Sequence, residues 1–361
     1  MATNPALEQF IRTIPLFSLV TADDLQEVLR LLRPVELKPG EVLFREGEAG
    51  KAMWVLGPGA EVSINSTHAG QRRPVVVAYA RTGDVVGEMA LVDDGPRSGT
   101  AVVTSGGQAH QIDAQEFHAM RATFVPAAFK VLRKVCVDLC SRLRQTNERI
   151  VTSGHADVHT PGLQVTGRPE VEVLNRFGPF SHLPSVVKLA LGQKLSMVQV
   201  DTLTPVFAEG EPSDGAWFIV EGEVSVGRNG KTLANLPAGT MFGVVACLDS
   251  GPRSASCVTT GPATLLKMGQ RDFEMLFASG HRFAFQMVDL VARQLVQHLR
   301  DANDLLPTPG GKPGTAGLAK PVKPMLHTEP SAEDLDLIPS AIEVDAASPL
   351  EFELDLSDLP T

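Results

Sequence analysis

The sequence GDVVGEMALVDDGPRSGT, residues 83–100, returns in altered form as GTMFGVVACLDSGPRSAS, residues 239–256. Gly83 aligns with Gly239 and Arg97 aligns with Arg253, both at a spacing of 156 positions. A motif that recurs with its glycines and its arginine in register indicates two copies of one domain.

The repeat extends upstream of these stretches at a spacing of 163 positions, through Phe17 and Phe180, Phe44 and Phe207, Gly47 and Gly210, and Trp54 and Trp217. Seven residues are therefore lost within the second copy, mostly where NSTHAGQRRP is replaced by GRNGK. Hairpin loops vary in this way on a fixed sheet.

Each copy predicts helices at both ends of a set of short strands. TADDLQEVLRLL has a threonine cap, an acidic first turn and apolar residues at helical spacing. Short apolar stretches such as AMWVLG and VVVAYA follow between glycines and prolines, and then a long amphipathic helix, AAFKVLRKVCVDLCSRLRQTNERI. We expect a mainly β fold with flanking α helices, in which two β-rolls of the jelly-roll type lie in tandem.

The pattern divides the chain into four parts. The first β-roll domain covers residues 10–150, a polar linker covers 151–171, the second β-roll domain covers 172–300, and a Pro-rich and then acidic tail covers 301–361. The tail is predicted to be disordered. Its residues 350–356 alternate apolar and acidic side chains, which favours a docking motif for a protein partner over a purely solubilising segment.

Composition limits the classes of function. No apolar run reaches membrane-spanning length and the start of the chain does not resemble a signal peptide, so we expect a cytoplasmic protein without membrane contact. The four cysteines are expected to be reduced and buried. The tail carries −9 of the net charge of −10, because it holds twelve Asp and Glu against three Lys. The rest of the chain is nearly neutral, which gives no sign of a nucleic-acid partner.

Residues 87–98 resemble the phosphate-binding cassette of the cyclic nucleotide-binding domain, the β-roll found in catabolite activator protein and in the regulatory subunits of cyclic AMP-dependent protein kinase. In that family the cassette contains Gly-Glu-hydrophobic-Ala and, about eight residues later, Arg followed by Ser, Thr or Ala. The resemblance implies that a cyclic nucleotide binds at Gly87, Glu88, Met89, Ala90, Arg97 and Ser98. Because Ser98 stands where a Thr is associated with cyclic GMP, the implied ligand is cyclic AMP (cAMP) rather than cyclic GMP (cGMP).

The residue types suit this ligand. Gly87 allows the chain to approach an anion closely at the start of a short helical turn. Glu88 can accept a hydrogen bond from a ribose hydroxyl, and Arg97 can pair with a phosphate oxygen, to which Ser98 can also donate. Surface pairing of Glu88 with Arg97 is the alternative without a ligand.

The second cassette keeps Gly243, Arg253 and Ser254 but has Val244 in place of the glutamate. A ribose hydroxyl would lose a charge-assisted hydrogen bond there, which costs about 1.5–3 kcal/mol. We expect this second site to be weak, empty or adapted to another ligand. Arg253 could equally be structural.

The long helix after the first β-roll is expected to cover the base, and Arg142, Arg144, Thr146 and Asn147 could reach it. Its apolar face could pair with a second copy of the chain as a homodimer or pack on the neighbouring β-roll.

The sequence therefore predicts a cyclic nucleotide receptor that relays occupancy to an unidentified protein partner through its tail or helices. A constitutive scaffold with vestigial pockets is the alternative. We expect no enzymatic activity, because no nucleophile and base set is found, and no metal site. His155 and His159 are interpreted as solvated linker residues. A DNA-binding role is disfavoured, since no helix-turn-helix follows either copy, and kinase inhibition has no support in the sequence.

Overall fold

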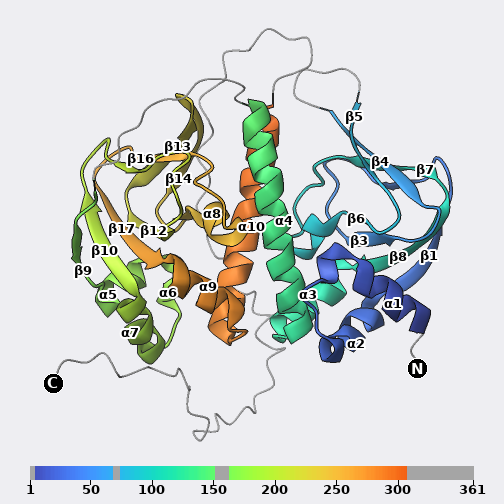
Figure 1. The fold of residues 1–361 in the computed structure, drawn as a ribbon, viewed down its shortest axis with the longest axis horizontal. Helices are drawn as coiled ribbons and strands as arrows, with labels where there is room; N and C mark the ends of the chain where they lie inside the picture. The colour runs from blue at the N-terminus through green and yellow to red at the C-terminus, as the bar shows by residue number, and fades with distance from the viewer. Residues whose placement is uncertain (1–4, 68–73, 151–161, 307–361) are drawn as a thin grey trace, which may run out of the picture. The chain divides into compact units, whose positions relative to one another are not determined.

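The computed structural model describes residues 5–67, 74–150 and 162–306 (Figure 1). The predicted tail, apart from its first six residues, and most of the predicted linker, with His155 and His159, lie outside the described residues. No helix within the described ranges is long and apolar enough to cross a membrane.

The first copy folds into two four-stranded antiparallel sheets, with the strand orders β1-β8-β3-β6 and β2-β7-β4-β5. Apolar side chains of both sheets, among them Leu56 and Val103, share one core. The strands are β1 (Arg33–Leu37), β2 (Val42–Phe44), β3 (Ala52–Leu56), β4 (Glu61–Ser66), β5 (Val75–Ala80), β6 (Val85–Val86), β7 (Thr100–Ser105) and β8 (Gly107–Asp113).

Helices flank this β-roll at both ends, as the sequence predicts. They are α1 (Pro5–Thr13), the 3-10 turn η1 (Pro15–Phe17), α2 (Ala22–Leu31), the 3-10 turn η2 (Glu88–Leu91), α3 (Ala114–Ala122) and α4 (Pro126–Ile150). The Asp113 side chain caps α3 by accepting from the backbone N–H groups of Gln115 and Glu116. The cap fixes where the β-roll ends and the helical part begins.

The second copy repeats this architecture, with the strand orders β15-β12-β17-β10-β9 and β11-β16-β13-β14. Its strands are β9 (Val165–Gly167), β10 (Leu195–Val200), β11 (Pro205–Phe207), β12 (Gly215–Glu221), β13 (Glu223–Arg228), β14 (Lys231–Pro237), β15 (Met241–Phe242), β16 (Ser256–Thr259) and β17 (Ala263–Gly269). Its helices are α5 (Val171–Arg176), α6 (Gly178–Ser181), α7 (Ser185–Lys194), α8 (Val244–Asp249), α9 (Gln270–Ala278) and α10 (Arg282–Asp304).

Two boundaries differ in detail from the predicted ones. Strand β9 pairs with β10 although it lies in the stretch predicted as linker, so ordered structure of the second copy begins before residue 172. Helix α10 runs to Asp304, past the predicted end at residue 300. The tight GRNGK hairpin between β13 and β14 forms as expected, with Asn229 and Gly230 both at positive φ.

The long helices α4 and α10 pack along each other (Figure 1). The rings of Phe129 and Phe285 are 4.5 Å apart between centroids, and the Cys136 thiol, 3.8 Å from the Val288 carbonyl oxygen, donates to it across the seam. Each helix thus covers the apolar face of the other, and neither face needs a second copy of the chain. All four cysteines are free and buried, as expected from the sequence.

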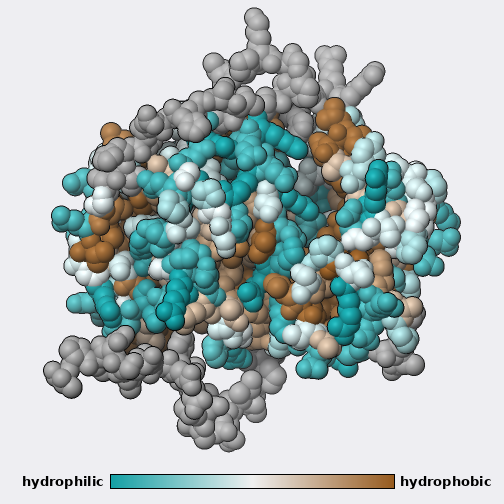
Figure 2. Space-filling model, in the orientation of Figure 1, coloured by the Kyte–Doolittle hydropathy of each residue, from teal (hydrophilic) through white to brown (hydrophobic). Residues whose placement is uncertain are grey.

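Strand β5 is the edge strand of its sheet and leaves Val76, Val77 and Tyr79 exposed. Figure 2 shows an apolar area near the upper end of this strand on a face that is otherwise largely hydrophilic. The same strand borders the cavity described next.

Candidate functional site

The first cassette begins where β6 ends. Gly87 has φ 84°, a conformation that side chains with a Cβ rarely adopt, and a Cβ there would lie 2.7 Å from Arg97 Nη1. Glycine at this position is therefore required both by the turn and by the arginine that packs on it. The turn opens η2, which contains Glu88, Met89 and Ala90.

Arg97 lies buried beneath this turn. Its guanidinium donates to the carbonyl oxygens of Gly87 at 3.0 Å and of Ala52 at 2.6 Å, and it lies 4.1 Å from the centroid of the Phe44 ring. Burial lowers its pKa from the ordinary arginine value, with Glu88 and Glu48 acting in the opposite direction. Among the described residues no carboxylate forms an ion pair with Arg97. Its charge is thus buried without a carboxylate in ion-pair contact among these residues, and Glu88 and Glu48 act on it only from a distance.

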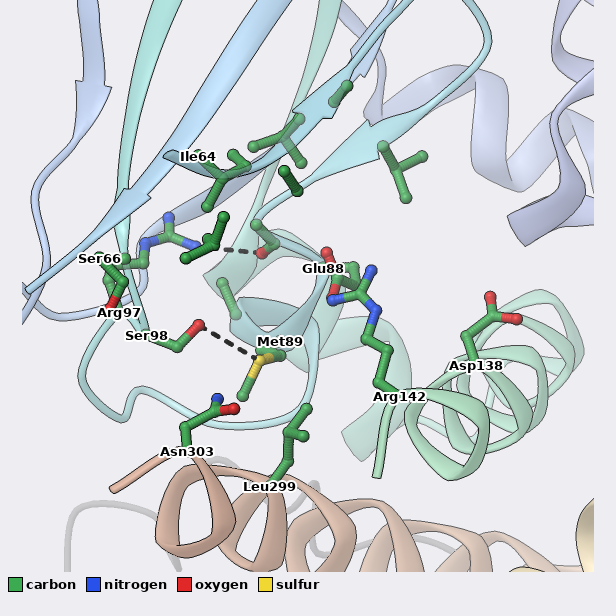
Figure 3. A pocket seen from close by; sticks show the side chains of 18 of the residues that line it. Ile64, Ser66, Glu88, Met89, Arg97, Ser98, Asp138, Arg142, Leu299 and Asn303 are labelled. Atoms are coloured by element: carbon green, nitrogen blue, oxygen red, sulfur yellow. Dashed lines mark hydrogen bonds and ion pairs between the residues drawn. The ribbon is translucent and has the colours of Figure 1, made fainter. Parts of the chain in front are cut away.

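Glu88 is also buried, and it does not pair with Arg97. Its Oε1 accepts from Arg142 Nη1 of α4 at 2.5 Å. Figure 3 shows Arg142 reaching Glu88 from the helix, while Arg97 lies on the other side of the cassette turn. The surface pairing of Glu88 with Arg97, the alternative without a ligand, is therefore absent.

A cavity of about 580 Å³ adjoins these side chains. Glu88, Arg97 and Ser98 line it together with Met89 and Ala90, and Ser98 Oγ lies 3.9 Å from Met89 Sδ. Further parts of the wall come from β5, from Arg142 and Thr146 of α4, and from Leu299, Arg300 and Asn303 of α10. Figure 3 shows Arg142, Leu299 and Asn303 around the cassette. All six predicted residues of the first site thus meet around one cavity.

The second cassette keeps the same backbone but pairs its arginine differently. Gly243 has φ 73°, and Arg253 donates to the carbonyl oxygens of Gly243 at 2.8 Å and Gly215 at 2.7 Å. Its Nη2 also lies 2.6 Å from Asp214 Oδ1. Burial raises the pKa of Asp214, but Lys267 and Arg253 beside it hold that pKa below the ordinary value. Arg253 therefore already has a carboxylate partner.

The cavity at the second cassette measures only about 90 Å³. Its lining is mostly apolar and includes Val244 and Phe207, with Arg253 and Ser254 at its edge. Ligand pockets typically measure about 300–1,000 Å³. The first cavity falls in this range and the second does not.

Of the four α4 residues proposed to reach the base, two lie at the first site and two at the second. Arg142 and Thr146 line the first cavity. Arg144 instead binds Asp249 of the second cassette, and Asn147 lines the second cavity, so neither reaches the first site. The sequence left open which of the four residues reach the base, and these two do not because α4 lies between the two copies.

Several contributors escaped the sequence analysis, among them Leu299, Asn303 and Asp214. Leu299 and Asn303 come from the second copy, about 200 positions away from the cassette, and no local pattern connects them to it. Asp214 had a signal in the sequence, because it stands 163 positions after Lys51 and thus replaces a base by an acid in the aligned repeat. No group of three or more His, Cys, Asp or Glu suited to a metal ion occurs within the described ranges.

Comparison with known proteins agrees with this geometry. Residues 34–124 and 198–279 each match the family model of the cyclic nucleotide-binding domain, one match inside each predicted β-roll, which confirms the predicted family and fold class. Both matched regions contain a cassette.

Two curated relatives align with different shares of this chain. The chain is 23% identical over 308 residues to the cAMP-dependent protein kinase type II regulatory subunit of Drosophila melanogaster. The alignment covers 84% of this chain and 70% of that protein. The chain is 29% identical over 140 residues to a CRP-like cAMP-activated global transcriptional regulator of Mycobacterium tuberculosis, which covers 37% of this chain and 62% of the regulator. Among solved structures, the regulatory domain of Toxoplasma gondii PKA in co-crystals with cAMP is 18% identical to this chain. The match covers 82% of this chain and 99% of that chain, with a TM-score of 0.31.

Proposed function

We propose, for a chain that carries two cyclic nucleotide-binding domains in tandem, that the first domain is a cyclic nucleotide receptor and the second is not. Arg97 would pair with the cyclic phosphate, Glu88 would accept from the ribose 2′-hydroxyl, and Ser98 would donate to the phosphate. The backbone N–H groups of the turn after Gly87 would complete the anion site.

The observation that carries this proposal is the difference between Arg97 and Arg253. Both arginines are buried, each under the turn of its own cassette, but among the described residues only Arg253 forms an ion pair with a carboxylate, that of Asp214. A buried charge without a counter-ion is costly, and an anionic ligand removes that cost. The first cassette thus favours an anion beside a cavity of nucleotide size, whereas the second has its charge compensated internally and has no such cavity.

The family resemblance favours cAMP over cGMP, because Ser98 follows the arginine at the position where a threonine is associated with cGMP. The fly relative is a cAMP-dependent protein kinase regulatory subunit and the mycobacterial one a cAMP-activated regulator, which points the same way.

Occupancy would be relayed through the helices. Arg142 and Thr146 of α4 line the cavity, so a ligand that contacts them changes the position of a helix that also packs on the second domain. We further predict a protein partner that senses this change on the helices or on the tail. We also predict that the chain has no catalytic activity and that it lies in the cytoplasm.

The test is calorimetric titration of the full chain with cAMP and cGMP. We expect one site per chain and tighter binding of cAMP. Arg97→Lys should weaken binding by about tenfold or more, since lysine keeps the charge but loses the fork that fits a phosphate. The matched variant Arg253→Lys should leave the affinity within about twofold, because the equivalent arginine does not meet the ligand.

Absence of heat with both nucleotides, in a protein that thermal unfolding shows to be folded, would refute the receptor function and favour the constitutive scaffold. Two bound nucleotides per chain would refute the assignment of the second domain.

A further inference from the structure

Helix α10 of the second domain binds the cassette of the first. Arg300 holds Asp93 with both nitrogens of its fork, Nη1 to Oδ2 at 2.7 Å and Nη2 to Oδ1 at 2.8 Å. Asp93 lies inside the cassette, between Glu88 and Arg97, and its Oδ1 also accepts from the Gly95 N–H at 3.2 Å. Both side chains of the pair are largely buried, which distinguishes it from a screened surface ion pair.

The same contact recurs with the domains exchanged. Arg144 of α4 binds Asp249 of the second cassette, with Nη2 2.9 Å from Oδ1, and it donates to the Pro252 carbonyl oxygen at 2.6 Å. The two arginines, the two aspartates and the glycines two residues after them, Gly95 and Gly251, are all related by 156 positions, the spacing of the cassettes themselves.

Gly95 and Gly251 leave room for the guanidinium groups of Arg300 and Arg144. A Cβ on Gly95 would lie 2.5 Å from the Arg300 nitrogens, and a Cβ on Gly251 would lie 2.7 Å from Arg144 Nη2. Each cassette thus leaves a space that the guanidinium of the other domain's helix fills. Two such crossed contacts at corresponding positions are a built feature of the tandem arrangement.

The first cassette has a second connection to α10 that the second cassette lacks. Asp289 of α10 forms an ion pair with Arg121 of α3, whose Nη1 donates to the carbonyl oxygens of Leu91 at 2.7 Å and Val92 at 2.8 Å. In the contact between α4 and the second cassette, Phe277 corresponds to Arg121 and Arg133 corresponds to Asp289. These two residues cannot form an ion pair. The first cassette is therefore connected to α10 through a second ion pair, by way of Arg121.

We propose that α10 positions the cassette of the first domain, so that a domain without a nucleotide site of its own sets the affinity of the first site. The inference rests on the proposed function and adds its regulation: any partner that shifts α10 would change nucleotide affinity. Arg300 also lines the first cavity, but both Nη atoms of its guanidinium bind Asp93, and we therefore assign it a positioning role.

The physical argument is preorganisation. Leu91, Val92, Asp93 and Gly95 connect the ribose-binding end of the cassette to Arg97, and α10 fixes this connection before a ligand arrives. When the fixing contacts are lost, the cassette has to be ordered at the expense of binding energy. A bidentate, largely buried ion pair that fixes such a loop corresponds to about a tenfold change in affinity.

The experiment compares Arg300→Ala with Arg144→Ala in the full chain. The two variants remove the same kind of contact, one from each cassette, and should lower the free energy of unfolding by similar amounts. Calorimetric titration with cAMP should show about tenfold weaker binding for Arg300→Ala and a change of less than about twofold for Arg144→Ala.

Hydrogen exchange of the nucleotide-free proteins measures the positioning directly, whether or not a nucleotide binds. Backbone N–H groups that are bonded within or to the first cassette, such as those of Ala90, Val92 and Arg97, should exchange faster in Arg300→Ala. In Arg144→Ala the faster exchange should be confined to residues 244–254.

Unchanged exchange of the first cassette in Arg300→Ala overturns the inference, as does faster exchange with unchanged affinity. Equal losses of affinity in both variants also overturn it, since they would indicate general destabilisation. A wild-type chain that binds no cyclic nucleotide refutes the proposed function instead, and the exchange data then decide alone whether α10 positions the cassette.

Discussion

Arg142 binds only one oxygen of Glu88, Oε1, at 2.5 Å. For the other oxygen, Oε2, the structure gives no hydrogen-bond partner among the described residues. The ion pair with α4 thus fixes the orientation of the carboxylate inside the cavity and leaves a lone-pair face for a ligand hydroxyl. A carboxylate held in this way binds more tightly than one that must first be ordered.

The first prediction concerns the ribose. Glu88→Gln should weaken cAMP binding by about ten- to hundredfold, because the hydrogen bond to the 2′-hydroxyl loses its charge assistance. The 2′-deoxy analogue should bind the wild-type protein with a similar loss, and the analogue should bind Glu88→Gln hardly more weakly than cAMP does. Calorimetry on the four combinations measures the coupling. Additive losses would mean that Glu88 does not contact this hydroxyl.

The second prediction transfers the counter-ion of the second domain to the first. Lys51 precedes Ala52, whose carbonyl oxygen accepts from Arg97, just as Asp214 precedes Gly215, whose carbonyl oxygen accepts from Arg253. Lys51→Asp should therefore place a carboxylate beside Arg97 and weaken cAMP binding by about tenfold or more, since the ligand then competes with an internal ion pair.

The control is Lys51→Ala, which removes the lysine without adding the acid and should change affinity by less than about threefold. If both variants lose affinity equally, the loss is caused by removal of the lysine and not by a new ion pair with Arg97.

The cassette could be predicted from the sequence because its functional groups lie within twelve consecutive residues. Gly87, Glu88 and Arg97 are held by one turn, so their spacing along the chain largely determines their spacing in space. The repeat likewise revealed the fold, since Arg253 and Gly243 stand in the same register on the same kind of turn.

The remaining part of the site depends on how two helices pack. The rotation of α4 about its axis decides whether Arg144 faces the first cavity or the second cassette. An amphipathic pattern does not say which surface covers the apolar face of the helix. Leu299 and Asn303 reach the first cavity for the same reason. An aligned comparison of the copies at positions 144, 300, 93 and 249 would have shown the paired charges but not that they cross.

The third prediction concerns the helix seam. Phe285 is buried and contacts both Phe129, at 4.5 Å between ring centroids, and Phe124, at 5.5 Å. Phe285→Ala should lower the free energy of unfolding by about 3–5 kcal/mol, because a large buried ring leaves a cavity between α4 and α10. Urea titration followed by circular dichroism measures the loss.

The exposed residue Met275 on α9 offers the control, and Met275→Ala should change the free energy of unfolding by less than about 0.5 kcal/mol. A small loss in Phe285→Ala would mean that the two helices do not depend on each other for stability.

The last prediction concerns pH. His298 of α10 borders the second cavity, and its Nε2 is enclosed and has no hydrogen-bond partner among the described residues. Burial lowers its pKa to about 4, so the folded protein keeps the ring neutral where an unfolded chain, with an ordinary value of about 6.5, takes up a proton. The stabilising effect is therefore complete above about pH 6.5 and is lost as the pH falls toward 4, by at most about 3 kcal/mol.

His298→Gln cannot take up this proton and should lose less stability than the wild type between pH 7.5 and pH 4.5, when both are unfolded with urea at each pH. The difference between the two proteins isolates the contribution of this ring, because His110 and His118, whose pKa values are also lowered by burial, are present in both. Parallel loss in the two proteins would contradict the assignment of a neutral, enclosed His298.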